Sequence, residues 1–150
     1  MLNLKPTSWT VTEDDVAAFE ARRSVSLPED YRAFLLKTNG GYLDGQPVFE
    51  ISSEEGGARL ILFYRLNDSS RSTETLDYMC SLHPRRLPPG IIKIGGEGTG
   101  GKICLGVAEP YRGRVYFWDP GMDFDDTEDG SLENVIELSA SFSAFIASLK

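Results

Sequence analysis

Histidine and cysteine are scarce in this chain of 150 residues, which has one histidine and two cysteines. His83 is the only imidazole that could act as a general base, and no Gly-x-Ser-x-Gly motif or reactive-cysteine context accompanies it. The 23 acidic residues offer many carboxylate pairs, but no spacing singles out two of them for glycosidase-type chemistry. We therefore expect a protein that is not an enzyme, with no catalytic residue, no cofactor and no metal site.

Cations and long apolar runs are also in short supply. Lysine and arginine number 15 against 23 acids, and the net charge of −8 disfavours nucleic-acid binding, which needs a surplus of cations. The longest apolar run, 60–64, is far shorter than the ~20 residues of a membrane helix, and the N-terminus lacks the apolar stretch of a signal peptide. We expect a cytoplasmic protein in which Cys80 and Cys104 are buried, unpaired thiols.

Helix signals lie near both ends of the chain, whose length favours one domain over residues 1–150. Thr12 is a predicted N-cap for a helix over 13–23. A second helix starts with Pro28 at its first position and ends at Asn39-Gly40-Gly41, since these residues tolerate a positive φ. Ser72 or Thr73 is the predicted cap of a third helix, and the apolar spacing of 142–149 predicts the last one.

Strand-like segments fill the region between these helices, at 48–51, 59–66, 91–94, 102–107, 114–118 and 135–138. Both faces of 59–66 are largely apolar, which predicts a strand inside a covered sheet. The aromatic residues at the end of 114–118 are predicted core, with a ligand-facing Trp118 as the alternative. The order predicts an α+β fold: N-terminal helices and a C-terminal helix packed around a central mixed or antiparallel β-sheet.

A glycine cluster at 95–101, followed by Lys102, satisfies two phosphate-binding signatures, G-x-G-x-x-G and G-x-x-x-x-G-K. Both signatures need a helix directly behind the loop, because the helix N-terminus meets the phosphate. The residues that follow, 103–107, are β-branched and apolar and predict a strand instead. Ile103 also stands where a P-loop needs a serine or threonine. The cluster is therefore interpreted as a hairpin turn between two strands, and nucleotide binding is disfavoured.

An acidic stretch extends over 119–130. An EF-hand that starts at Asp125 would place Ile136 at its twelfth position, where a bidentate glutamate is required, so a calcium loop of this kind is rejected. Looser metal binding is a minor alternative, and a solvated loop is the ordinary interpretation of such a charge run. Residues 119–137 hold eight acids and no lysine or arginine, so the whole net charge of the chain is concentrated in this stretch.

Three segments together resemble the SUKH superfamily, the SMI/KNR type. The first is Leu27-Pro28-Glu29-Asp30-Tyr31-Arg32-Ala33-Phe34-Leu35 with its Asn39-Gly40-Gly41 ending, preceded by Glu20. The second leads from Ile103-Cys104-Leu105 to Gly113-Arg114-Val115-Tyr116-Phe117-Trp118-Asp119, and the third is Ser141-Phe142. The resemblance covers about 12–149. One departure is Gly106, which stands where many relatives have an aspartate.

The resemblance implies an α+β fold and a binding role, with no catalytic residue to carry over. Many bacterial members are similar to immunity proteins that neutralise polymorphic or contact-dependent toxins, often nucleases or deaminases, whereas fungal members are regulatory scaffolds in cell-wall synthesis. The first hypothesis is therefore an immunity protein that occludes the active site of a cognate toxin. Its predicted contacts are five residues of the acidic stretch: Asp123, Asp125, Asp126, Glu128 and Asp129.

The alternative is a regulatory adaptor that binds a cellular protein through its sheet face. The apolar surroundings of Tyr64 and Trp118 would then form the contact, and binding would respond little to salt. Both hypotheses expect a protein partner, with no nucleic acid and no membrane.

Overall fold

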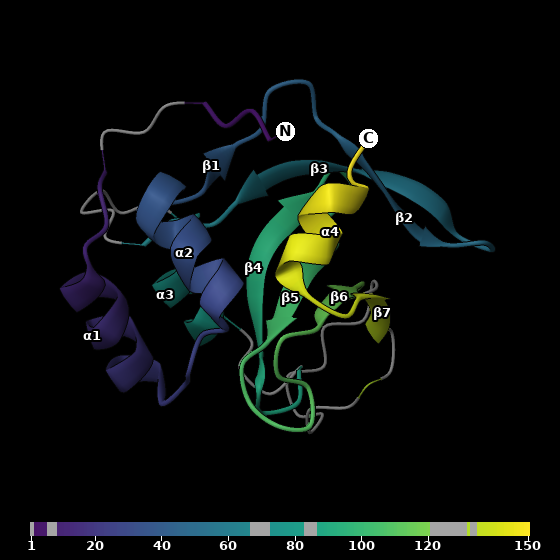
Figure 1. Ribbon diagram of the computed structural model, residues 1–150. Coiled ribbons are helices and arrows are strands. Elements are labelled where there is room, and N and C mark those ends of the chain that lie inside the picture. The colour runs from purple at the N-terminus through teal and green to yellow at the C-terminus, as the bar shows by residue number, and fades with distance from the viewer. Residues whose placement is uncertain (1, 6–8, 67–72, 83–86, 121–131, 133–134) are drawn as a thin grey trace.

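The computed structural model describes residues 2–5, 9–66, 73–82, 87–120, 132 and 135–150. Over these residues the chain forms four helices and seven strands (Figure 1). The helices are α1 (Glu13–Arg23), α2 (Glu29–Thr38), α3 (Leu76–Ser81) and α4 (Phe142–Ser148). The strands are β1 (Gly41–Tyr42), β2 (Val48–Ser52), β3 (Gly56–Phe63), β4 (Ile91–Glu97), β5 (Lys102–Gly106), β6 (Val115–Trp118) and β7 (Val135–Ser139).

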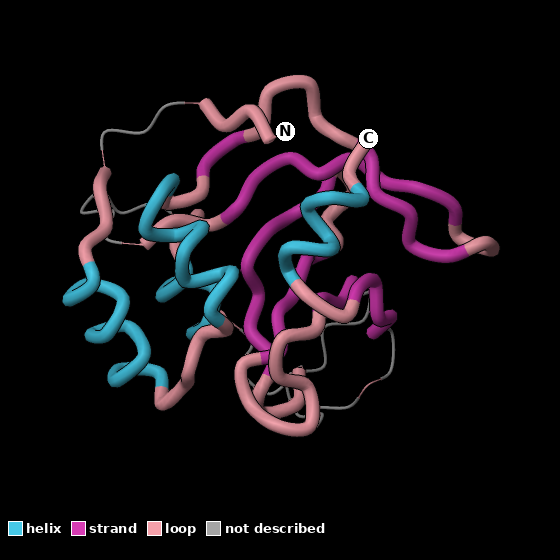
Figure 2. Tube along the Cα trace, in the orientation of Figure 1, coloured by secondary structure: helices cyan, strands magenta, loops and turns pink. Residues whose placement is uncertain are grey.

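The strands form a sheet in the order β1-β3-β4-β5-β6-β7, with β2 also paired to β3. Each named pair is antiparallel, so the predicted α+β class is confirmed and the sheet is antiparallel rather than mixed. β3 lies between β1 and β2 on one side and β4 on the other, which confirms the interior strand. Figures 1 and 2 show α4 in front of the sheet, α2 beside it and α1 outermost, and Phe142 of α4 packs on Phe63 of β3.

Local signals determine the ends of the first two helices. Thr12 Oγ1 accepts from the Asp15 amide at 3.2 Å and the Asp15 carboxylate accepts from the Thr12 amide at 2.9 Å, which is a capping box. Pro28 is the N-cap of α2 rather than its first helical residue. Asn39 ends α2 at φ 53° and ψ 30°, the left-handed conformation that the Asn-Gly-Gly sequence predicts.

The helices on the α4 side pack on the sheet through phenylalanine and tyrosine rings. Phe34 of α2 lies 5.0 Å from Phe63 of β3 and 5.0 Å from Phe142 of α4, measured between ring centroids. Tyr31 meets Phe142 edge-on at 5.1 Å. These contacts join α2, α4 and the sheet into the main core, and they account for the i, i+3, i+4 apolar stripe of α2.

A second buried cluster is built from alternate positions of the same strands. Its members are Leu87, Ile91, Cys104, Tyr116 and Trp118, whereas Ile103, Leu105 and Phe117 belong to the main core. Because successive strand residues face opposite sides, the sheet is buried on both faces at β5 and β6. The predicted burial of the aromatic residues of β6 is thus confirmed.

The start of α3 differs from the prediction, because Thr75 is its N-cap and not Ser72 or Thr73. Thr75 Oγ1 accepts from the Tyr78 amide at 3.1 Å. The backbone just before α3 is extended, since Arg65 and Thr75 form a parallel bridge and Leu76 donates to the Arg65 carbonyl at 2.8 Å. This tertiary pairing delays the helix to Leu76, and the sequence around the cap does not reveal it.

The glycine cluster is a β-hairpin, as predicted. Gly95 and Gly96 lie within β4, the turn follows Glu97, and β5 rather than a helix comes next. A side chain on Gly95 would lie 2.7 Å from the Leu62 carbonyl oxygen, and one on Gly101 would overlap the Phe117 ring. Close packing between strands therefore explains these glycines.

Tyr31 gives a prediction about stability and pH. Its hydroxyl is buried and has no hydrogen-bond partner among the described residues, and burial raises the pKa of the Tyr31 phenol above its usual value. The unfolded chain ionises above pH ~10 while the folded chain stays protonated, so this group lowers stability as the pH rises past that value. We expect Tyr31→Phe to gain up to about 1 kcal/mol at neutral pH and to lose less stability in alkali.

Urea unfolding at neutral pH and above pH ~10 measures both effects. The matched control is Tyr78→Phe, since the Tyr78 ring is exposed. A Tyr31→Phe variant that loses stability in alkali as steeply as the control would contradict the assignment.

Candidate interaction surface

The five acidic residues expected to contact a partner lie outside the described residues: Asp123, Asp125, Asp126, Glu128 and Asp129. The ends of their segment are described. Trp118 at the end of β6 and Val135 at the start of β7 are register partners. The acidic segment therefore connects two neighbouring antiparallel strands and leaves and rejoins the sheet at one place.

Two further acids flank this segment. Glu137 of β7 accepts from Arg114 at 3.0 Å, and this hydrogen bond raises the pKa of the Arg114 guanidinium. Both side chains are about half exposed, so the pair contributes little to stability. Asp119, at the other flank, is exposed.

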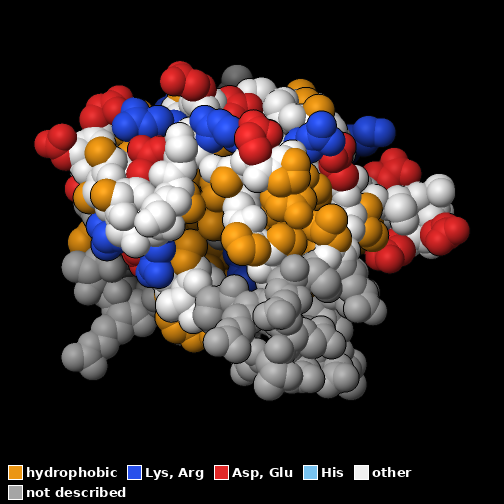
Figure 3. All heavy atoms as spheres, turned by 90° about the horizontal axis from the view of Figure 1, so that it is seen from below, with side chains coloured by type: hydrophobic (Ala, Val, Ile, Leu, Met, Phe, Trp, Pro, Cys, Tyr) orange, Lys and Arg blue, Asp and Glu red, His pale blue; other side chains and the backbone are white. Residues whose placement is uncertain are grey.

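A second acidic feature is the hairpin formed by β2 and β3, which sequence reasoning did not single out. It projects from the body of the molecule in Figure 1, and acidic side chains gather on it in Figure 3. Glu50, Glu54 and Glu55 are its exposed acids. The run Glu54-Glu55-Gly56-Gly57, which combines charge with turn residues, is the signal that could have located it.

Tyr64 and Trp118, the contacts of the adaptor alternative, are both buried, with 3% and 4% of their surfaces exposed. Lys102 Nζ lies 5.9 Å from the Tyr64 ring centroid and Lys93 Nζ lies 5.3 Å from that of Trp118. A partner reaches these rings only if the structure around them opens. The adaptor alternative thus stays a prediction.

Lys93 is a buried cation that sequence reasoning missed. It is 4% exposed, and its Nζ donates to the carbonyl oxygens of Met79 at 3.3 Å and Leu82 at 2.6 Å. These carbonyls lie at the C-terminal end of α3, where the helix dipole favours a positive charge. Lys93 therefore holds α3 against β4. Its place between Ile92 and Ile94 in an apolar strand was the available signal.

The two thiols are free in the structure, as expected; Cys104 is buried and Cys80 is half-buried. Burial raises the pKa of Cys104 to about 12 and also raises that of Cys80, so both thiols are poor nucleophiles at neutral pH. Among the described residues, no group of three or more histidine, cysteine or acidic side chains is arranged to hold a metal. His83 lies outside the described residues.

Comparison with known proteins identifies the family of the chain. The sequence model of the SMI1 / KNR4 family (SUKH-1) matches residues 10–148, nearly the whole chain. The chain belongs to this family. SUKH proteins are commonly immunity-type binding proteins. The segments that resemble the family form the start and end of α2, the buried strands β5 and β6, and the N-terminus of α4.

The chain is also similar to the SPbeta prophage-derived uncharacterized protein YokK of Bacillus subtilis (strain 168). The two are 26% identical over 155 residues, which cover 92% of this SUKH chain and 74% of the relative. No solved structure matches the chain. In the part of the chain that the structure describes, no helix is both long and apolar enough to cross a membrane.

Proposed function

We propose that this SUKH protein is an immunity protein that binds a cognate toxin domain in the cytoplasm and occludes its active site. Membership of the family is the observation that supports it most, because bacterial members of the family are commonly of this type.

The charge of the chain supports a nuclease as the toxin. A nuclease presents a basic cleft to its phosphate substrate, and an acidic inhibitor that fills the cleft is drawn to it by long-range attraction. Six acids lie between the flanks of the acidic segment, the five predicted contacts and Glu133, and the sequence from 119 to 137 contains no lysine or arginine. The segment connects β6 and β7, whose ends Trp118 and Val135 are register partners.

The test is the association rate with the toxin domain encoded beside this protein. We expect replacement of Asp123, Asp125, Asp126, Glu128 and Asp129 by their amides to slow association by about 10- to 100-fold at low salt. The remaining rate should depend less on ionic strength, because screening acts on the charges that were removed. Stopped-flow measurements at several salt concentrations check both expectations.

A matched control separates the position of the charges from the net charge. It neutralises five exposed acids elsewhere on the molecule: Asp14, Glu29, Asp44, Glu54 and Glu55. The control is expected to keep most of the wild-type rate and salt dependence. If both variants slow equally, the acidic segment is not the contact, and if the toxin domain is not bound at all, the proposed function is wrong.

A further inference from the structure

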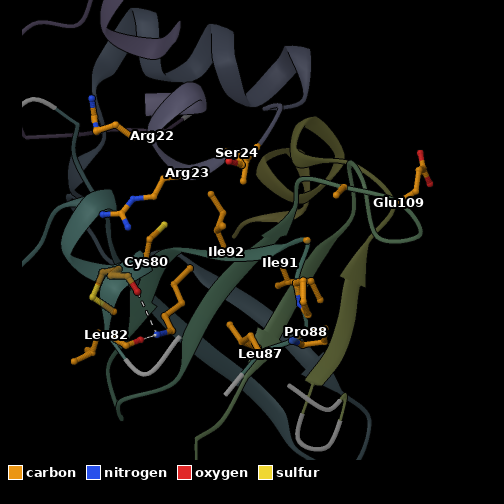
Figure 4. A pocket seen from close by; sticks show the side chains of 16 residues that line it. Arg22, Arg23, Ser24, Cys80, Leu82, Leu87, Pro88, Ile91, Ile92 and Glu109 are labelled. Atoms are coloured by element: carbon orange, nitrogen blue, oxygen red, sulfur yellow. Dashed lines mark hydrogen bonds between the residues drawn. The ribbon is translucent and has the colours of Figure 1, made fainter. Parts of the chain in front are cut away.

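A cavity of about 620 Å³ lies between the C-terminal end of α1, the helix α3 and the start of β4 (Figure 4). This volume falls within the range of ligand pockets, roughly 300–1,000 Å³. Much of its wall is apolar and comes from Leu82, Leu87, Ile91 and Ile92. In Figure 4 the Ile92 side chain points from β4 toward Ser24, the residue that follows α1. The cavity can therefore accommodate a bulky apolar group.

One wall of the cavity is cationic. Arg22 and Arg23 both bind Asp77, at 2.8 Å from Arg22 Nη2 and 3.2 Å from Arg23 Nε, and Arg23 Nη2 also donates to the Asp77 carbonyl. Two guanidinium groups thus share one carboxylate. Within the described ranges, the Nη1 group of neither arginine has an acceptor. The Arg23 side chain is 30% exposed, so its free N–H donors are accessible beside the apolar wall.

The local charge is opposite to that of the molecule as a whole. Among the described residues, Arg22, Arg23 and Lys93 line this cavity, and Asp77 and Glu109 are the carboxylates beside it. These five side chains carry one net positive charge, on a chain whose net charge is −8. Figure 4 shows the Glu109 side chain turned away from the other lining groups. An anion attached to an apolar group complements both walls.

We propose that this cavity binds a segment of a partner protein in which a bulky apolar side chain stands next to a carboxylate. The apolar side chain packs against Leu82 and Ile92, and the carboxylate accepts hydrogen bonds from Arg23. A buried apolar anchor with a charged neighbour is a common arrangement at protein interfaces.

The cavity lies on the same sheet as the described ends of the acidic segment. The cavity adjoins the Ile91 end of β4, where Ile91 pairs with Gly106. The acidic segment leaves the sheet at Trp118, which pairs with Lys102 at the other end of β5. The two are linked through Lys93, which lines the cavity and whose Nζ lies 5.3 Å from the centroid of the Trp118 ring.

The experiment is selection of peptides from a random phage-displayed heptapeptide library on the wild-type chain, followed by anisotropy titration of a labelled selected peptide. We expect the selected peptides to share an aspartate or glutamate adjacent to a bulky apolar residue. Arg23→Gln is expected to weaken their binding about 10-fold, because it removes a charge-assisted hydrogen bond. Ala108→Glu, which adds a carboxylate at an exposed position on the cavity wall, is expected to weaken it at least as much.

Lys37→Gln is the matched control, since it also removes one cation but at an exposed position at the end of α2. It should bind the selected peptides as the wild type does. Thermal unfolding of each variant establishes that it is folded before its affinity is compared. The proposal is overturned if no shared sequence is selected, if the selected peptides lack an acid, or if Arg23→Gln and Ala108→Glu bind them unchanged.

Discussion

Replacing Gly106 by alanine is expected to lower the free energy of unfolding by about 3 kcal/mol or more, the upper range for overpacking a core. An added Cβ would overlap the carbonyl oxygen of Tyr111 and would lie 2.9 Å from the Tyr111 Cβ. Neither atom can move away easily. Gly113 donates to the Gly106 carbonyl at 2.9 Å and Gly106 donates to the Arg114 carbonyl at 2.9 Å, so the turn is fixed directly over this glycine.

Gly98→Ala is the matched control for this change. Gly98 is exposed in the turn after β4, and an added Cβ there would meet nothing closer than 3.9 Å. We expect this variant to stay within about 0.5 kcal/mol of the wild type. Urea denaturation followed by tryptophan fluorescence compares the two. Equal stability of the two alanine variants would contradict this prediction, because it would show that the Tyr111 backbone moves away from residue 106 at little cost in free energy.

Gly106 also explains the departure from the family pattern that the sequence revealed. The family resemblance leads us to expect an aspartate at this position, and the resemblance alone gives no reason for a glycine. The structure supplies the reason: the Tyr111 backbone lies where a side chain would be. Gly106→Asp is therefore expected to destabilise this chain at least as much as alanine does.

Features that depend on neighbours in the sequence were predictable. The Thr12 cap, the apolar stripe of α2 and the left-handed Asn39 all depend on contacts within a few residues, so spacing and residue type reveal them. The positions of the buried strands β5 and β6 were predictable too, because their apolar residues are close together in the sequence. In β3 the pairing register shifts between Leu60 and Leu62, so the simple two-residue alternation predicted for 59–66 does not hold along its length.

Features that depend on distant partners were not predictable. The Thr75 cap depends on pairing with Arg65, and the burial of Lys93 depends on the carbonyls of α3. For the candidate site, composition located the acidic segment, and the strand register now places its two ends. The cavity is lined by residues between Arg22 and Glu109, which only the fold brings together.

Replacing Asn39 by alanine is expected to lower the free energy of unfolding by about 3–4 kcal/mol, the sum of lost hydrogen bonds to buried groups and the cost of a left-handed alanine. Asn39 is 2% exposed. Its Oδ1 accepts from the Leu66 amide at 2.8 Å, and its Nδ2 donates to the carbonyls of Leu66 at 2.7 Å and Trp9 at 3.1 Å. One side chain thus joins the end of α2 to two distant backbone segments.

Asn39→Gly separates the two causes, because glycine adopts φ 53° without strain but makes none of these hydrogen bonds. We expect the glycine variant to be about 1 kcal/mol more stable than the alanine variant, the cost of one left-handed residue, yet still well below the wild type. In both variants the Leu66 amide should exchange its proton with solvent faster, since it loses its acceptor. Equal stability of the alanine and glycine variants would show that the left-handed backbone at residue 39 costs alanine nothing. Unchanged exchange at the Leu66 amide would show that the Asn39 side chain does not protect it.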